Sequence, residues 1–559
     1  MKMTGAKIVI ETLLEQGVDT VFGFPGATVI DIYDKLFERG DKIRHVLAAH
    51  EQGAAHAADG YARATGKPGV VIATSGPGAT NLVTGIATAF LDSVPMIAIT
   101  GNVSNSMIGR DAFQEIDITG VTLPITKHNF FVRDIKVLAD TIREAFKIAT
   151  SGRPGPVLID IPNDIQTATL EFKSKGKIIP AKPAKAEDDD VAKACEMIAE
   201  CKRPYIYFGG GAVRAGAGKE ILKLADKIDA YIGCSMMGLS EIPTDTPRFL
   251  GMQGMHGHFA SSVALAKSDL MIAVGVRFSD RATGKTDRYA LNSKKIHIDA
   301  DCAEIGKNVS VDLGVCCDIK DFIVRLTDAV ETKKLPDWEE KIKSLRARES
   351  DAYDDDTFVP REVILEIASK VTGDTRIATD VGQHQMWTAQ FYKFRQKHTW
   401  LSSGGLGTMG FGLGASIGAC FATGKRAVLI TGDGSFGMSL NELATAVTYK
   451  VPVTIVVFNN RTLGMVRQWQ TLFYDKRYAG TTIDRQTDFV KLAEAFGAKG
   501  FKADDIDAFR KAFDEAYAYD GPAVIDMSID SDAMVLPMLR PGGTFDNLVT
   551  WKEAENEEG

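Results

Sequence analysis

Two short polar segments stand where buried strands should end, and together they could hold a metal ion. Gly432-Asp433-Gly434-Ser435 follows the apolar run 427–431, and Asn459-Asn460 follows the run 453–458. Continuous apolar runs of this length indicate strands of a parallel sheet, whose carboxyl ends commonly bind ligands. Glycines there let backbone N–H groups approach phosphate oxygens, whereas a carboxylate would repel them unless a cation lies between. The segments therefore predict Mg²⁺, which prefers oxygen ligands and shares them with phosphates.

Three residues are candidate ligands of this ion. Asp433 and Asn460, which lie 27 residues apart, could each supply a side-chain oxygen, and Thr462 could supply its backbone carbonyl. Each segment alone is compatible with an ordinary turn or strand exit. The combination at this distance favours a metal-diphosphate site.

This combination resembles the motif of thiamine-diphosphate enzymes, and the resemblance extends over nearly the whole chain to the acetohydroxyacid synthase (acetolactate synthase) catalytic-subunit family. The family implies an α/β fold of three doubly wound parallel-sheet domains. We expect a pyrimidine-binding domain over 1–172, a central FAD-binding domain over 188–332, a diphosphate-binding domain over 358–532 and a tail over 533–559. Thiamine diphosphate, Mg²⁺ and FAD are the implied cofactors.

The resemblance assigns Glu51 as the carboxyl that exchanges a proton with the cofactor's ring nitrogen. A lone Glu on a helix is more often simply solvated, so this assignment depends on the resemblance. The segment around Glu51 lacks the adjacent His-His pair of simple decarboxylases, which argues against release of a free aldehyde. In the superfamily this domain faces the diphosphate domain of another subunit, which implies a homodimer or tetramer.

The resemblance also supplies the remaining cofactor contacts. Around thiamine diphosphate they are Gly382, Gln383, His384, Met409, Gly432, Gly434 and Ser435. Around FAD they are Arg153, Gly211, Met255, His256, Gly275, Arg277, Asp299 and Asp318. The flavin performs no net redox step in this family, so its expected role is structural.

Four positions match residues that meet the substrates. Arg281 should pair with an acceptor carboxylate, and Trp469 should favour 2-ketobutyrate over pyruvate as the second substrate. Phe113 and Gln114 should lie near the first intermediate, with Gln114 counted beside Glu51 as catalytic. Asn163 departs from the usual Lys of the family, which puts substrate affinity in doubt but leaves the reaction type unchanged.

The implied reaction decarboxylates pyruvate and condenses the two-carbon carbanion with pyruvate or 2-ketobutyrate, in the biosynthesis of valine, leucine and isoleucine. One alternative is an FAD-dependent pyruvate oxidase, which shares the three domains and the cofactors. Another is a non-catalytic scaffold or regulatory paralogue that keeps the fold. A separate small regulatory subunit is common in the family.

The elements that must position these residues form three segments. Residues 173–190 mix Pro, Gly and charge runs, and residues 331–360 form a charged, helix-like segment followed by Asp354-Asp355-Asp356, so both are expected to be linkers. A weak internal echo relates segments one and three: Ser75-Gly76-Pro77-Gly78, a helix and Val94-Pro95 correspond to Gly432-Asp433-Gly434, a helix and Val451-Pro452. The two segments are therefore expected to share a topology, whether by duplication or by chance.

Bulk composition excludes several classes of function. The 559 residues are 45% hydrophobic and 25% charged, and no apolar stretch approaches a membrane span. The net charge of −8 argues against nucleic-acid binding. The seven cysteines are scattered without a C-x-x-C pair, which predicts free thiols in a reducing compartment and no zinc site. The N-terminus shows neither a signal nor a transit pattern, so a cytoplasmic location is expected.

Overall fold

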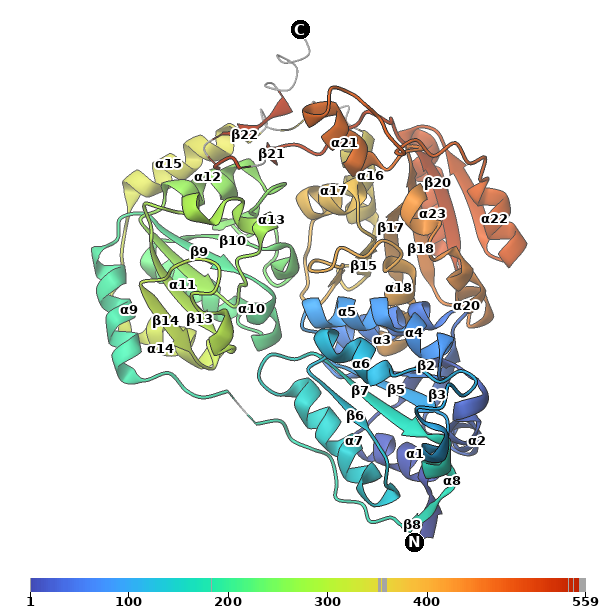
Figure 1. Ribbon diagram of the computed structural model, residues 1–559. Helices are drawn as coiled ribbons and strands as arrows, with labels where there is room; N and C mark the ends of the chain where they lie inside the picture. Colours follow the sequence, from blue (N-terminus) through green and yellow to red (C-terminus); the bar gives the residue numbers. More distant parts are fainter. Residues whose placement is uncertain are drawn as a thin grey trace.

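The protein folds into three units, each built on a parallel sheet of six strands (Figure 1). The computed structural model describes residues 2–181, 183–349, 353, 359–540, 542–545 and 547–551. The predicted acidic run 354–356 and residues 552–559 of the predicted tail lie outside the described residues. None of the helices in the described ranges combines the length and the apolarity that crossing a bilayer requires.

The first sheet has the strand order β3-β2-β4-β5-β7-β6. Its strands are β2 (Thr20–Phe24), β3 (Arg44–Leu47), β4 (Gly69–Ala73), β5 (Met96–Asn102), β6 (His128–Phe131) and β7 (Pro156–Pro162). Alternate residues of β4 and β5 face two separate apolar clusters, so both faces are buried, as the continuous apolar runs predict. The helices are α1 (Gly5–Glu15), α2 (Ile30–Glu38), α3 (Glu51–Thr65), α4 (Pro77–Asn81), α5 (Val83–Leu91), α6 (Ile118–Thr122), α7 (Ile135–Thr150) and α8 (Asn163–Thr167), and β1 (Lys2–Thr4) pairs with β8 (Thr169–Glu171).

The third sheet repeats this topology. Its order is β16-β15-β17-β18-β20-β19, which in both sheets places the strands in the sequence 2-1-3-4-6-5. The strands are β15 (Arg376–Thr379), β16 (Trp400–Leu401), β17 (Ala427–Gly432), β18 (Val453–Asn459), β19 (Lys499–Ala503) and β20 (Ala523–Ser528). The two echoed segments both follow the third strand, β4 and β17, so the shared topology predicted from the echo is confirmed. The helices are α16 (Val359–Lys370), α17 (Gln383–Phe391), α18 (Gly412–Thr423), α19 (Asp433–Phe436), α20 (Leu443–Thr448), α21 (Gly464–Phe473), α22 (Phe489–Phe496) and α23 (Ile506–Ala518).

The central sheet has a different order, β11-β10-β9-β12-β13-β14, which is the 3-2-1-4-5-6 order of dinucleotide-binding folds. Its strands are β9 (Pro204–Phe208), β10 (Tyr231–Cys234), β11 (Phe249–Met252), β12 (Leu270–Val274), β13 (Lys294–Asp299) and β14 (Leu313–Cys316). The strand order reverses between β9 and β12, and such a reversal opens a crevice at the carboxyl ends of the strands. The helices are α9 (Asp188–Glu200), α10 (Gly210–Ala215), α11 (Gly218–Ile228), α12 (Phe259–Lys267), α13 (Asp280–Thr283), α14 (Ile319–Ala329) and α15 (Pro336–Ala347).

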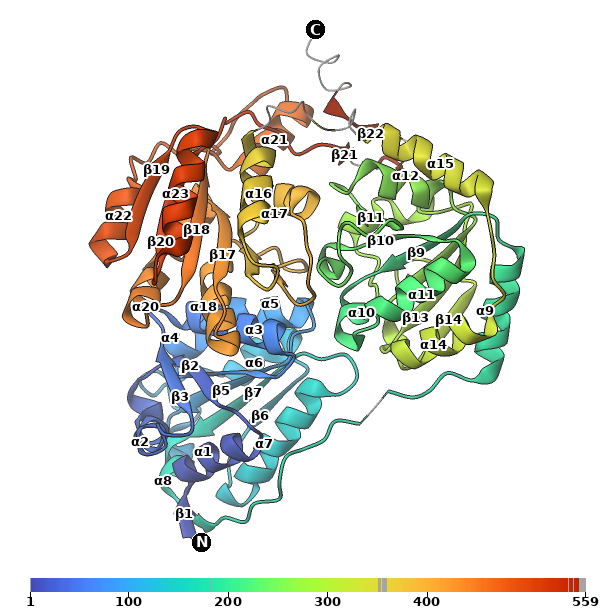
Figure 2. The same ribbon diagram turned by 180° about the vertical axis from the view of Figure 1, so that it is seen from behind.

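The two predicted linkers differ in character. Residues 173–181 and 183–187 contain no helix or strand and run along the outside of the molecule from β8 to α9 (Figure 2). The second segment contains α15, whose Trp338, Ile342 and Leu345 are buried in the core of the central domain. The Trp338 indole donates to the backbone carbonyl of Pro204 at 3.1 Å, so α15 belongs to that packing.

The first and third domains pack through α3 and α18, which lie side by side in both views (Figures 1 and 2). Glycines make this approach possible. A Cβ on Gly60 would lie 2.1 Å from the Ala415 carbonyl oxygen, and one on Gly418 would lie 1.8 Å from that of Ala57. The helix that begins with Glu51 is therefore held directly against the third domain of its own chain.

The C-terminal segment returns to the central domain. After β20 the chain forms β21 (Met538–Leu539), which pairs antiparallel with β22 (Leu548–Val549). The Leu539 N–H donates to the Met255 carbonyl at 2.8 Å, and Leu539 and Leu548 join the apolar cluster that contains Trp338. The tail thus crosses from the third domain to a wall of the central one.

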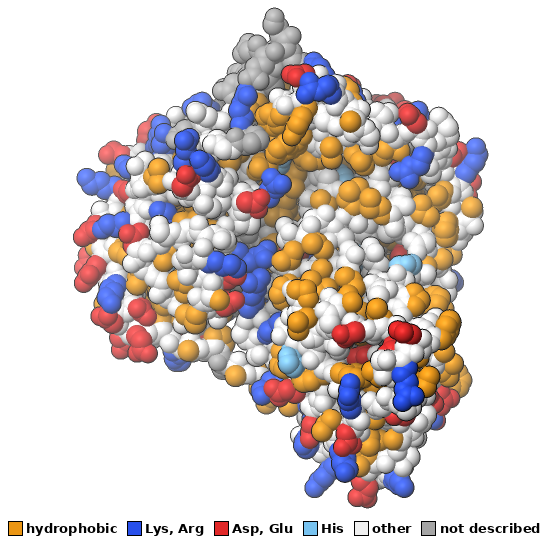
Figure 3. Space-filling view, viewed as in Figure 1, with side chains coloured by type: hydrophobic (Ala, Val, Ile, Leu, Met, Phe, Trp, Pro, Cys, Tyr) orange, Lys and Arg blue, Asp and Glu red, His pale blue; other side chains and the backbone are white. Residues whose placement is uncertain are grey.

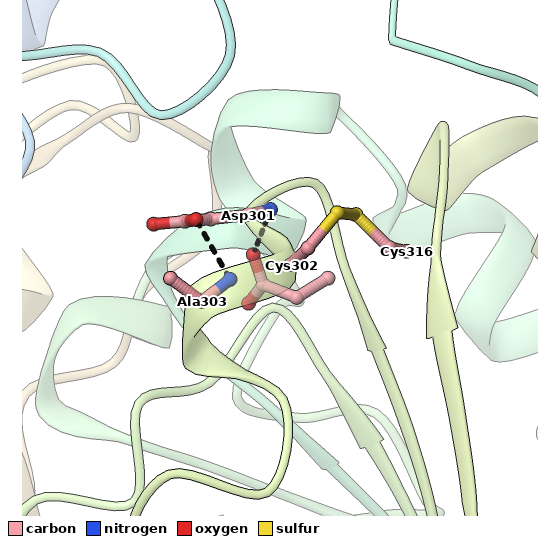
Figure 4. Close-up of a disulfide and its surroundings, with 5 residues drawn as sticks. Asp301, Cys302, Ala303 and Cys316 are labelled. Atoms are coloured by element: carbon pink, nitrogen blue, oxygen red, sulfur yellow. Dashed lines mark hydrogen bonds between the residues drawn. A yellow bond between two sulfur atoms is a disulfide. The ribbon is translucent and has the colours of Figure 1, made fainter.

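The prediction that all cysteines are free thiols is wrong for two of them. Cys302 and Cys316 form a disulfide with a Cα–Cα distance of 5.1 Å (Figure 4). Cys302 follows β13 and Cys316 ends the adjacent strand β14, where it pairs with Asp299. Strand adjacency brings the two residues together, and neither a cysteine count nor C-x-x-C spacing reports it. The remaining cysteines are free: Cys195, Cys201, Cys234, Cys317 and Cys420.

Candidate active site

The candidate metal ligands meet at the carboxyl edge of the third sheet. β17 and β18 are paired through Gly432 and Phe458, so Asp433 and Asn460 leave adjacent strands at the same edge. The Asn460 Oδ1 accepts from the Thr462 N–H at 3.2 Å, which turns the chain so that Thr462 stays beside it. Among the described residues no three His, Cys, Asp or Glu side chains gather to form a metal cage. This set of one carboxylate, one amide and one carbonyl suits an ion that takes its other oxygens from phosphates.

Asp433 is buried, and burial raises the pKa of its carboxyl to about 6, because a charge is costly away from water. The charge of Arg485 acts in the opposite direction. A divalent cation beside this carboxylate would favour its ionised form in the same way. The environment of Asp433 therefore fits a metal ligand.

A glycine-lined cradle lies next to Asp433. The ring of His384 covers Gly432, where an added Cβ would lie 3.1 Å from its Nδ1, and also covers Gly382. His384 Nε2 is buried without a hydrogen-bond partner, and burial lowers the pKa of the ring to about 3. A neutral ring with a spare polar atom can hydrogen-bond a ligand placed over these glycines.

The other predicted contacts surround the same cradle. The Ser435 hydroxyl donates to the Val381 carbonyl at 3.2 Å, which ties the two loops together. A Cβ on Gly434 would lie 3.7 Å from Met409 Cε, so Met409 borders the cradle. Asn460 Nδ2 donates to Gln383 Oε1 at 3.3 Å. The structure thus links Gly382, Gly432, Gly434 and Met409 in one cradle beside Asp433, while Asn460 and Thr462 leave the adjacent strand at the same edge.

A cavity of about 970 Å³ opens at the strand reversal of the central sheet. Every residue predicted for the flavin lines it: Arg153, Gly211, Met255, His256, Gly275, Arg277, Asp299 and Asp318. Gly211 and Gly275 stand at the crossover, where a Cβ on Gly211 would lie 2.6 Å from the Gly275 Cα. Only glycine allows the loops after β9 and β12 to approach this closely.

Charges in this cavity are arranged in two groups. Burial lowers the pKa of Arg214 to about 10 and also lowers that of Arg277. Burial raises the pKa of Asp299 to about 6. Buried cations that lack sufficient counter-charge suit phosphate groups, and a carboxylate at a strand end suits ribose hydroxyls. In Figure 3, Lys and Arg side chains gather along the junction between the central domain and the rest of the molecule.

Unpartnered polar atoms provide a test of whether a nucleotide fits. Gln253 Oε1, His256 Nδ1 and Glu304 Oε2 are buried without a hydrogen-bond partner, and all three residues line the cavity. Buried polar groups in proteins are normally satisfied, so these atoms are consistent with a polar ligand. The residues present fit FAD in size, charge and hydrogen-bonding capacity.

Glu304 and Arg214 are among the charged residues of this cavity that sequence reasoning missed. Glu304 accepts from Arg153 Nη1 at 2.6 Å and so orients the arginine that comes from the first domain. Arg214 lies one turn into α10, where a Cβ on Gly210 would be 3.2 Å from its Nη1. The position of Arg214 in the helix that follows Gly209-Gly210-Gly211 was an available signal. Glu304 had none.

Two of the four predicted substrate residues reach the same cavity. Arg281 and Trp469 both line it, Arg281 from α13 and Trp469 from α21. The Arg281 side chain is 68% exposed, its Nε lies 3.9 Å from Asp280 Oδ2, and its Nη1 donates to Met255 Sδ at 3.7 Å. Phe113 and Gln114 do not line this cavity. Phe113 is 85% exposed on the surface of the first domain, and Gln114 packs against Gly76.

Glu51 occupies a prepared position at the start of α3. Its side chain is buried, and the Asn81 amide donates to its Oε2 at 2.9 Å. The preceding turn is held by Glu442 of the third domain, whose carboxylate accepts from the His50 N–H at 3.0 Å and the Ala49 N–H at 3.2 Å. Glu51 is not among the residues that line the large cavity.

Asn163, the departure from the family pattern, donates from its amide to Asp31 Oδ2 at 3.1 Å. It begins the short helix α8 at the end of β7.

Comparison with known proteins agrees with this arrangement. The N-terminal TPP binding domain of thiamine pyrophosphate enzymes matches residues 3–121, their central domain matches 191–326, and their C-terminal TPP binding domain matches 380–527. A probable acetolactate synthase large subunit of Methanocaldococcus jannaschii is 45% identical over 98% of this chain and 95% of its own. The acetolactate synthase large subunit of Corynebacterium glutamicum is 44% identical over 98% of this chain and 90% of its own. The acetolactate synthase of Mycobacterium bovis is 44% identical over 98% of this chain and 91% of its own.

Proposed function

The chain belongs to the acetolactate synthase large-subunit family of thiamine pyrophosphate enzymes, and we propose on this basis that it condenses two 2-keto acids with loss of CO₂. Pyruvate is the donor, and pyruvate or 2-ketobutyrate is the acceptor. The products are 2-acetolactate and 2-aceto-2-hydroxybutyrate, precursors of valine, leucine and isoleucine. Thiamine diphosphate, when bound, supplies the electron sink that the decarboxylation needs. The single observation that carries this proposal is full-length similarity together with an intact Glu51, Asp433 and Asn460.

In this proposal the third domain holds the cofactor's diphosphate through Mg²⁺. Asp433, the Asn460 side chain and the Thr462 carbonyl bind the ion, and the buried carboxylate of Asp433 supports this role. The phosphates lie over the cradle formed by Gly382, Gly432, Gly434 and Ser435, with Gln383 and His384 as hydrogen-bond partners. Met409 borders the cradle, where an apolar side chain can hold the cofactor in a bent shape.

Glu51 contacts the far ring of a cofactor held by a second subunit, so the active form is a homodimer or a pair of dimers. Apolar side chains spread over the viewed face of the first and third domains in Figure 3, which supports a large contact. The exposed large hydrophobic residues of the first and third domains include Phe113, Leu123, Leu406 and Met438, whereas those of the central domain are Leu291 and Val324. Phe113 and Gln114 would reach the substrate in the partner's cavity.

FAD occupies the large cavity and has a structural role. The predicted flavin residues that line it, together with the dinucleotide-type strand order, support this assignment. Arg281 then binds the acceptor's carboxylate, while Trp469 contacts its alkyl group and so favours 2-ketobutyrate. The domain limits inferred from sequence, 1–172, 188–332 and 358–532, leave out α15, which packs in the core of the central domain, so we place the end of that domain after α15. The name of these relatives, large subunit, supports a separate small subunit as a further partner.

The test is a reaction with purified protein, pyruvate, thiamine diphosphate, Mg²⁺ and FAD. We expect acetolactate as the dominant product. When 2-ketobutyrate is added, 2-aceto-2-hydroxybutyrate should be formed in excess over acetolactate. Acetate formation with bleaching of the flavin would identify a pyruvate oxidase instead. Failure to bind thiamine diphosphate would identify a non-catalytic relative.

A further inference from the structure

The loop that follows β4 places one amide against the carboxylate of Glu51. Asn81 is the last residue of α4, and its Nδ2 donates to Glu51 Oε2 at 2.9 Å. The two residues lie 30 positions apart in sequence and come from different elements. A hydrogen bond to a buried carboxylate is among the stronger polar contacts in a protein, because the acceptor is charged.

The other oxygen of Glu51 has a different environment. It faces Gly78, where an added Cβ would lie 3.2 Å from Glu51 Oε1 and 2.7 Å from Thr74 Cγ2. A side chain at position 78 would therefore fill the space beside Oε1. Glycine leaves that side of the carboxylate accessible to another group, while Asn81 engages the opposite oxygen.

A carboxyl that exchanges a proton must present one defined oxygen to its partner atom. Resting on the proposed function, we propose that Asn81 is a positioning residue, which holds Oε2 so that Oε1 faces the cofactor's ring nitrogen. Asn81 acts only through Glu51. It contributes orientation, and without its amide the carboxylate can rotate about its terminal bond and present either oxygen.

A second effect follows from the donor character of the amide. Asn81 donates a hydrogen to Oε2, so this oxygen is already engaged and the proton exchanged with the ring belongs on Oε1. Glutamine at position 81 keeps the donor on a longer side chain. Aspartate keeps the shape but replaces the donor with an acceptor.

The experiment compares N81A, N81D and N81Q with the control T80A, whose hydroxyl contacts only its own helix at the Pro77 carbonyl. Three quantities are measured on the full chain: the melting temperature, the dissociation constant of Mg²⁺-thiamine diphosphate, and the rate of deuterium exchange at C2 of the bound cofactor. The dissociation constant is also measured for a cofactor analogue that carries C–H in place of the ring nitrogen.

We expect N81A to slow the exchange about 10- to 100-fold, which is less than the roughly 10²- to 10⁴-fold of a general acid-base group itself because Asn81 only orients that group. The melting temperature should fall by no more than a few degrees, since one hydrogen bond is lost. The preference of N81A for thiamine diphosphate over the analogue should fall about tenfold. N81D should be slower than N81A, N81Q should recover part of the rate, and T80A should equal the wild type. Should N81A fail to fold, the isosteric N81D provides the same comparison.

Exchange in N81A within about twofold of the wild type would overturn the inference. An equal loss of affinity for thiamine diphosphate and for the analogue would also overturn it, because the effect of Asn81 would then not depend on the ring nitrogen. If the wild-type protein itself neither binds the cofactor nor exchanges its C2 proton, the proposed function fails, which is a distinguishable result.

Discussion

Replacing Asp433 by asparagine should stabilise the protein when no metal or cofactor is bound. The carboxyl is buried, and burial raises its pKa from an ordinary 3.8 to about 6. A carboxyl whose pKa is higher in the folded state binds more protons there than in the unfolded chain between these two values. Stability therefore falls as the pH rises through this window, and the full penalty is present above about pH 6. The asparagine side chain of D433N would keep the shape and the hydrogen-bond acceptor without the charge.

The size of the effect follows from the shift. Roughly two pKa units at about 1.4 kcal/mol each correspond to about 3 kcal/mol above pH 7, and about half of this remains at pH 5. For a domain of this size, 1 kcal/mol corresponds to roughly 2–4 °C in melting temperature. D433N should thus melt several degrees above the wild type at pH 8, and the gap should narrow at pH 5.

Calorimetry of the metal-free protein at the two pH values is the assay, repeated with Mg²⁺ and thiamine diphosphate. Ligand at about 100 times its Kd stabilises a folded protein by about 2.7 kcal/mol. The wild type should gain this stability, whereas D433N should not, because it lacks the carboxylate that binds the metal. The difference between the two melting temperatures should then become smaller or change sign. The reasoning is refuted if metal-free D433N melts below the wild type at pH 8, or if the difference is the same at both pH values.

Three further outcomes are expected. W469L should lower the ratio of 2-ketobutyrate to pyruvate products about tenfold or more in a competition assay, since the indole lines the cavity, and an unchanged ratio would remove Trp469 from specificity. R153A should weaken FAD binding about 10- to 100-fold in a fluorescence titration, whereas R133A, whose side chain packs on Phe131 outside the cavity, should not. The C302S/C316S double variant should lose about 3 kcal/mol of stability, estimated from a loop separation of 14 residues, and should melt identically with and without reductant. Wild-type melting that is insensitive to reductant would contradict this last expectation.

The parts of the fold that sequence predicted are those governed by local pattern. The apolar runs at 427–431 and 453–458 became β17 and β18 with ends shifted by a single residue. Because parallel strands share one carboxyl edge, residues after different strands could be expected to lie at the same edge, and Asp433 and Asn460 do leave adjacent strands there. The predicted flavin residues, which were inferred from the family resemblance, all line one cavity.

The parts that sequence missed depend on which elements become neighbours. Cys302 and Cys316 pair because β13 and β14 are adjacent. The segment of α15 has the charged composition of a linker, although the spacing of Trp338, Ile342 and Leu345 is that of an amphipathic helix. Asn81 is unremarkable by type, and its contact with Glu51 exists only once α4 lies beside α3. Whether Glu51 meets the Asp433 of a second chain stays a prediction.

The returning tail imposes an order on biosynthesis. Met255 lies in the wall of the large cavity, and its backbone carbonyl accepts from the N–H of Leu539, which is translated more than two hundred residues later. Domains generally fold in the order in which they leave the ribosome, so the central sheet can form long before that wall acquires its last support. The cavity can therefore bind a ligand in its final form only after β22 has been translated. A chain truncated after β20 would contain all the strands of the three sheets but would lack Leu539, which supports this wall.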